Sequence, residues 1–152
     1  MNAEKWETPT GFHFFDMADS SAVFVVCPSK TFVVQTERGL GERLQRAQEG
    51  RRSKRPLTHE LLSDFCAAFD VKVVGVAFSS VRDDVYYAEI TLKMKNELGE
   101  KLVVVDARPS DALALAFAAH APVVVLKEML DRCRDAAPLL RKLRERDPGI
   151  KF

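Results

Sequence analysis

Two short segments of this chain combine basic side chains, hydroxyl groups and carboxylates where a helix is expected to begin. The first is Arg-Pro-Leu-Thr-His-Glu-Leu at residues 55–61, and the second is Asp-Ala-Arg-Pro-Ser-Asp-Ala at residues 106–112. The start of a helix leaves backbone N–H groups without partners and carries a partial positive charge, so it favours an anion. Each segment could therefore bind a phosphate group.

The first segment offers several groups that suit phosphate chemistry. Arg55 can bind a phosphate with two hydrogen bonds, and Thr58 is predicted to be the N-cap and a further phosphate contact. His59 could transfer a proton near neutral pH, and Glu60 could be a metal ligand. A structural interpretation stays open, in which Thr58 only caps the helix, Arg55 pairs with a nearby carboxylate and His59 lies on the surface.

The second segment places an arginine between two carboxylates. Asp106 and Asp111 could hold Mg²⁺ or Mn²⁺ and take part in catalysis, while Arg108 could neutralise a phosphate. Ser110 is predicted to cap the helix and to contact phosphate. The alternative is an ion-pair network that only fixes the turn from strand to helix. A shared active site further requires that the two helix starts meet in space.

Other reaction types lack their motifs. The sequence has no glycine-rich phosphate loop, no Gly-x-Ser-x-Gly, no His-Glu-x-x-His and no Cys-x-x-Cys. The three cysteines are far apart in the chain and odd in number, so we expect them to be reduced.

The first half of the chain is expected to position these segments with strands and two helices. Alternating and β-branched residues predict strands over 12–17, 22–27 and 30–36, arranged as a meander. A short helix is expected over 42–48. A second helix is expected from Thr58, since apolar residues recur there at helical spacing: Leu61, Leu62, Phe65, Cys66 and Phe69.

The second half is expected to form a hairpin around a buried helix. The sequence predicts strands over 71–78, 86–95, 101–107 and 123–126, with turns at 79–84 and 96–100. The helix over 109–120 is apolar on every side, so it is expected at the centre of the core. Two amphipathic helical stretches, 127–134 and 139–146, are expected on either side of Pro138. This pattern predicts a single-domain α+β fold with a mainly antiparallel or mixed sheet, a buried central helix and flanking helices.

Composition is that of an ordinary globular protein. The 152 residues are 47% hydrophobic and 30% charged, and no apolar run could span a membrane. The start of the chain does not resemble a secretory signal, so a cytoplasmic location is expected.

The net charge is only +1, but residues 38–55 hold seven basic side chains against Glu42 and Glu49. This block is either a solvated face or a surface for nucleic acid.

The motifs resemble those of the bifunctional nuclease domain family. The resemblance rests on Arg-Pro-Leu-Thr-His-Glu-Leu-Leu at 55–62, Tyr-Tyr-Ala at 86–88, the eleven residues from Asp106 to Ala116, and Ala-Pro-Val-Val-Val at 121–125. It implies an α+β domain, often oligomeric, with cleavage of DNA and RNA by some members. The first third departs from the family pattern, because Gly39-Leu40-Gly41-Glu42 stands where a Glu-Ala pair usually opens a helix.

The resemblance and the residue chemistry together predict a nuclease. We expect a nuclease-like domain over 1–134, with 55–131 carrying the resemblance, and a helical tail over 135–152. The predicted activity is hydrolysis of phosphodiester bonds in DNA, RNA or both, assisted by magnesium or manganese, in a homo-oligomer without membrane contact. The alternative is a non-catalytic oligomeric interaction or regulatory module that binds nucleic acid or protein.

Overall fold

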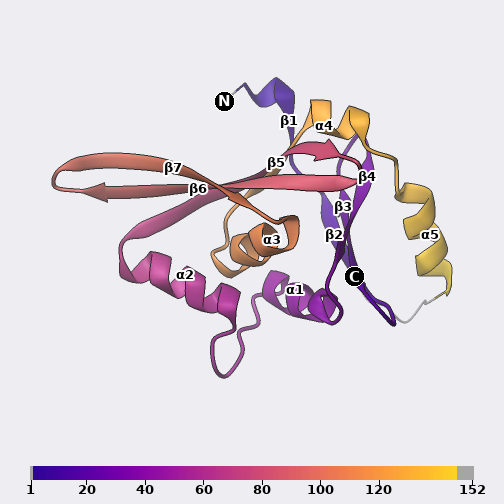
Figure 1. Ribbon diagram of the computed structural model, residues 1–152, viewed down its shortest axis with the longest axis horizontal. Helices are drawn as coiled ribbons and strands as arrows, with labels where there is room; N and C mark the ends of the chain where they lie inside the picture. The colour runs from indigo at the N-terminus through magenta and orange to yellow at the C-terminus, as the bar shows by residue number, and fades with distance from the viewer. Residues whose placement is uncertain (1, 147–152) are drawn as a thin grey trace.

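A three-stranded antiparallel meander forms one of two sheets. A computed structural model describes residues 2–146, and its strands β2 (Gly11–Asp16), β3 (Ser21–Val26) and β4 (Thr31–Thr36) pair in the order β2-β3-β4 (Figure 1). Strand β3 is buried along nearly its whole length, because both of its faces are covered. The predicted meander is confirmed.

The other sheet contains five strands, in the order β1-β8-β5-β6-β7. These are β1 (Trp6–Glu7), β5 (Val71–Arg82), β6 (Val85–Asn96), β7 (Gly99–Ala107) and β8 (Val123–Leu126). Only the β5–β8 pair is parallel, so the sheet is mixed. The long β6–β7 hairpin projects beyond the rest of the molecule (Figure 1).

Strand β5 is longer than expected. It runs to Arg82, so the predicted turn over 79–84 is wrong and only Asp83 and Asp84 form the turn. Both have positive φ angles of 50° and 61°. A short aspartate side chain tolerates this left-handed backbone better than most residues, which allows a two-residue connection between long strands.

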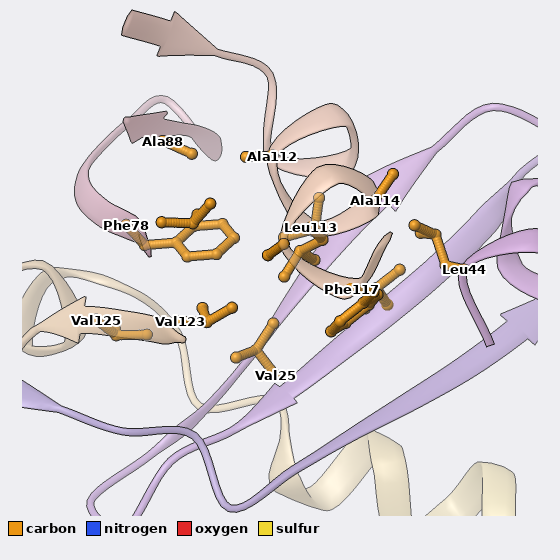
Figure 2. Packing of buried hydrophobic residues seen from close by; sticks show 14 of the residues in the cluster. Val25, Leu44, Phe78, Ala88, Ala112, Leu113, Ala114, Phe117, Val123 and Val125 are labelled. Atoms are coloured by element: carbon orange, nitrogen blue, oxygen red, sulfur yellow. The ribbon is translucent and has the colours of Figure 1, made fainter. Parts of the chain in front are cut away.

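Helix α3 (Pro109–Ala118) lies at the centre of the core, as its sequence predicts. Its residues from Ala112 to Phe117 are all buried. Figure 2 shows Ala112 beside Ala88 of β6, while Leu113 and Phe117 extend among larger apolar side chains. The helix ends before the predicted residue 120, where His120 adopts a left-handed φ of 52°. Helices α1 (Leu40–Gln48) and α2 (Thr58–Ala68) both contact it.

Helices α4 (Lys127–Arg132) and α5 (Ala137–Arg146) pack near the meander. Lys30 ties α4 to it, since its Nζ donates to the carbonyl oxygens of Leu130 and Cys133 at 2.6 and 3.0 Å, and the N–H of Ala136, just before α5, donates to the carbonyl of Thr31 at 2.7 Å. Pro138 lies in the first turn of α5 and not between two helices, because a proline is accepted where helical N–H groups have no partner anyway. The last six residues of the expected tail lie outside the described residues.

The fold is therefore α+β, as expected. None of the helices within residues 2–146 is long and apolar enough to cross a membrane.

Asp16 holds the start of α1 against the meander. Its carboxylate accepts hydrogen bonds from the N–H groups of Gly41 and Glu42, at 3.2 and 3.0 Å, and from the buried hydroxyl of Ser21. A Cβ atom on Gly41 would lie 2.8 Å from this carboxylate. The glycine is therefore required by the close approach of the helix to its cap.

We predict that Asp16→Ala lowers the free energy of unfolding by about 1–2 kcal/mol, because α1 loses its N-terminal acceptor. In that variant, adding Gly41→Ala should recover up to about 1 kcal/mol, since alanine favours the helix and its clash is gone. Urea unfolding measures both, with exposed Gln48→Ala as the control. A further loss on adding Gly41→Ala would contradict this account of the cap.

Candidate functional site

A broad hollow of ≈ 960 Å³ opens at the start of α3, and we call it the α3 hollow. It is bounded by the end of β4, the start of β6, the link from β7 to α3 and the segment leading into α5. Residues from both sheets therefore meet there. Its chemically useful side chains include Glu37, Tyr86, Tyr87, Asp106, Arg108 and Ser110.

Arg108 occupies the mouth of the α3 hollow. Its Nε donates to Asp111 at 2.8 Å and a terminal nitrogen donates to Glu37 at 3.3 Å. The hydrogen bond to Asp111 raises the pKa of Arg108, and the charges of Asp111 and Glu37 act in the same direction. The side chain is 68% exposed, so these pairs orient the guanidinium more than they stabilise the fold.

Ser110 does not cap α3, contrary to prediction. The N-cap is Arg108, Pro109 is the first helical residue and Ser110 is the second. The proline ring supplies the helical φ angle and needs no N–H partner, so it moves the boundary back by two residues. Ser110 is only 8% exposed, lines the hollow, and has no hydrogen-bond partner for its hydroxyl within residues 2–146. The hydroxyl oxygen keeps access to the hollow, so water or a ligand can reach it.

Asp106 and Asp111 lie on different sides of Arg108. Asp106 is the penultimate residue of β7, pairs in register with Glu89 of β6 and lines the α3 hollow. Asp111, in the first turn of α3, is exposed and is held by Arg108. The register places Asp106 at the end of the sheet, as the hairpin pattern predicts.

The first segment surrounds a second, smaller depression of ≈ 480 Å³, which we call the α2 hollow. His59 and Glu60 line it together with basic side chains from α1 and the following loop: Arg43, Arg46, Arg51 and Lys54. Arg55 and Thr58 are exposed and line neither hollow. The α2 hollow is therefore strongly basic, in contrast to the mixed charge of the α3 hollow.

Glu60 stabilises the loop before α2. Its side chain is 5% exposed and accepts the N–H of Ser53 at 2.9 Å and the N–H of Leu57 at 2.7 Å. Burial by itself would raise the pKa of Glu60, but these two hydrogen bonds outweigh it and the pKa is lowered. The N-cap is Leu57 and not the predicted Thr58; Glu60, three residues later, accepts the N–H of this N-cap residue, as the glutamate of a capping box does.

His59 is kept neutral by its surroundings. Burial lowers its pKa below the ordinary value of 6.5, and Arg43 lowers it further, while Glu60 opposes both. A neutral imidazole can accept a proton, which suits a base near neutral pH.

The two segments do not share one hollow. Glu37 lines the α3 hollow and Gly39 lines the α2 hollow, so the chain entering α1 lies between them. No three His, Cys, Asp or Glu residues in the described part of the chain are grouped to hold a metal ion. In particular, Glu60 does not form a metal site with Asp106 and Asp111, because each of its carboxylate oxygens accepts a hydrogen bond from a backbone N–H.

Several lining residues were not expected from the sequence. Arg134 and Asp135 come from the segment before α5 and reach the α3 hollow only through folding. Arg43 and Arg46 belong to the basic block at 38–55, whose charge was visible but whose position beside His59 was not. Tyr86 is part of a recognised motif; burial raises its pKa to about 12, so its hydroxyl stays protonated.

Comparison with known proteins identifies the family of this chain. The model of the bifunctional nuclease domain matches residues 33–137, which is more than half of the chain. The chain therefore belongs to the bifunctional nuclease domain family. Two uncharacterized proteins of Mycobacterium tuberculosis are each 30% identical over 83 residues, covering 55% of this chain. The chain spans 46% of the length of these curated relatives.

We predict that Glu60→Gln lowers the free energy of unfolding at pH 7 by about 1–3 kcal/mol, because two charge-assisted hydrogen bonds are weakened. Since folding lowers the pKa of Glu60, its charge stabilises the protein above the ordinary value of 4.5 and less as the pH falls through the folded value. Urea unfolding from pH 3 to pH 7 measures this. Asp64→Asn, which removes an exposed pair with Arg52, is the control and should cost less than about 1 kcal/mol.

We predict that the pKa of His59, measured by NMR titration, lies below 6.5 and rises in Arg43→Gln, because a nearby positive charge is removed. Arg141→Gln, an exposed change on α5, should leave it unaltered. An unchanged pKa in Arg43→Gln would show that burial alone keeps the imidazole neutral.

Proposed function

We propose that this protein is a nuclease that hydrolyses phosphodiester bonds of DNA, RNA or both in the α3 hollow. The observation that carries the proposal is the Ser110 hydroxyl, which has no protein partner among residues 2–146, keeps access to the α3 hollow and lines it with Arg108 and Asp106 at the start of a helix. This combination offers hydrogen-bond donors and positive charge to a phosphate. Membership of the bifunctional nuclease domain family supports the choice of substrate.

In the proposed reaction the chain's own residues bind phosphate and move one proton. Arg108 and Ser110 bind the non-bridging oxygens and stabilise the charge that develops on them. Asp106 accepts a proton from the attacking water, whose oxygen forms a bond to phosphorus as the bond to the leaving oxygen breaks, and the leaving oxygen takes a proton from solvent. Exposed Tyr87, 40% accessible in the same hollow, provides an aromatic face for a nucleobase.

A divalent metal remains part of the proposal only for Asp106 and Asp111. Mg²⁺ is often held by one or two carboxylates together with substrate phosphate, so Asp106, which lines the α3 hollow, could hold it, and Asp111 would join only after releasing Arg108. Bound magnesium or manganese would neutralise negative charge on the phosphate. Glu60 is left out, because both of its oxygens are bonded to the backbone.

The α2 hollow is proposed to bind the nucleic-acid backbone away from the cleaved bond. Its four basic side chains outnumber the carboxylates of Glu42 and Glu60. Phosphate contacts of this kind add affinity without reading sequence. The same surface supports the second candidate, a non-catalytic interaction or regulatory module that binds nucleic acid. In either case we propose that the protein acts as a homo-oligomer.

We predict that Asp106→Asn and Ser110→Ala each reduce cleavage of labelled single- and double-stranded DNA and RNA by about 100-fold or more. His59→Ala should reduce it less than about tenfold, because His59 lies in the other hollow. Cleavage is measured with magnesium, manganese or a chelator, and exposed Glu145→Gln is purified identically as the control.

Equal cleavage by every folded variant would reveal a contaminating nuclease and exclude the proposed site. Salt-dependent binding that remains without cleavage would then favour the interaction module. A complete loss in His59→Ala alone would move the reaction to the α2 hollow.

A further inference from the structure

The apolar side of α2 faces away from the protein. Leu61, Leu62, Phe65 and Phe69 are 47%, 49%, 55% and 69% exposed, and we call them the outer face of α2. The first, third and fourth are spaced by four residues, so they share one side of the helix. The rings of Phe65 and Phe69 are stacked 6.4 Å apart, which makes a continuous apolar ridge.

The opposite side of α2 carries the contacts with the rest of the protein. Glu60 is buried there against the preceding loop, and Cys66 packs on the main core. The helix is thus held by its more polar side while its apolar side lacks a covering element within residues 2–146. An amphipathic helix normally buries its apolar side, so this arrangement indicates a missing partner.

The chemistry of the outer face limits the choice of partner. The most exposed residues of α2 are uncharged, namely Thr58, Leu61, Leu62, Phe65, Ala67 and Ala68, and Asp64, whose side chain is 45% exposed, is paired with Arg52. A surface for nucleic acid would need basic side chains, and a helix that lies on a membrane usually carries lysine or arginine on its polar side. Here the polar side holds Glu60, Ser63 and Asp64. The partner is therefore an apolar protein surface.

The size of the outer face matches one half of an ordinary dimer interface. A phenylalanine offers roughly 150–250 Å² for burial, so two rings that are 55% and 69% exposed present about 250 Å² between them. The two leucines, each about half exposed, bring the ridge to several hundred Å². A standard interface buries about 800 Å² per partner, of which somewhat more than half is apolar.

Strand β7 also carries exposed apolar side chains. It is the last strand of its sheet, and Leu102, Val104 and Val105 are 62%, 61% and 42% exposed. Long exposed edge strands of this composition normally pair with another chain or are shielded. Helix α2 and the β6–β7 hairpin both extend from the same side of the molecule (Figure 1).

We infer that a second copy of this chain binds the outer face of α2, so that two α2 helices pack across a two-fold axis. A second copy carries the same uncharged ridge, which makes the contact self-complementary, as a two-fold interface requires. This inference deepens the homo-oligomer part of the proposed function by assigning its contact surface. It does not depend on nuclease activity.

The test is the molar mass of the full chain in solution, measured by sedimentation velocity from about 1 to 100 µM. The unmodified protein is expected to be a dimer at the upper concentrations. The double variant Leu61→Glu with Phe65→Glu should raise the dissociation constant by about 100-fold or more, because like charges would face each other across the axis. Met17→Glu adds a carboxylate at a residue 44% exposed elsewhere and should leave the dimer intact.

Two further measurements show whether a lost dimer reflects the assigned contact or a folding defect of the variant. Mixing Phe65→Lys with Phe65→Glu should restore a dimer that neither forms alone, and amide exchange over residues 61–69 should slow as the unmodified protein is concentrated. A monomer at 100 µM, or a dimer that persists in the double variant, would overturn the inference. So would a monomer that sediments with phosphatidylcholine vesicles, which would identify lipid as the occupant.

Discussion

The burial of α3 between the two sheets is the constraint on which the rest of the structure depends. Its residues from Ala112 to Phe117 lose almost all contact with solvent. Alanine at Ala112 and Ala114 lets β6 and α1 approach closely, while Leu113 and Phe117 fill the space between the layers (Figure 2). Because this helix begins at the edge of the core, its first residues Pro109 and Ser110 line the α3 hollow.

The two motifs differ in how they use their polar groups. Both carboxylate oxygens of Glu60 accept hydrogen bonds from backbone N–H groups, so Glu60 organises the loop before α2 and is not available to a metal. Ser110 is as well buried but has no such partner within residues 2–146, and Arg108 beside it is oriented by two carboxylates. The side chains at the start of α3 are therefore the ones left open to a ligand, whereas the start of α2 supplies structure and a basic surface.

Much of the fold could be predicted because it is encoded locally. The meander, the β6–β7 hairpin and the enclosed α3 each follow from the period or composition of a continuous stretch. The errors fell where a distant or competing group decides the boundary. At α2, where Glu60 bonds the preceding backbone, the N-cap is Leu57 and not the predicted Thr58. At α3, where Pro109 opens the helix, the N-cap is Arg108 and not the predicted Ser110. Two aspartates with positive φ angles let β5 run on through a predicted turn.

The sequence by itself determined the fold class, the order of most elements and the residue types of both motifs, because these depend on short-range periodicity and side-chain chemistry. Only the tertiary structure decided that the motifs line separate hollows, with the chain before α1 between them. It also decided that the apolar side of α2 faces outward. Helical spacing shows that Leu61, Phe65 and Phe69 share a face, but which surface covers that face depends on the packing of segments distant in the chain.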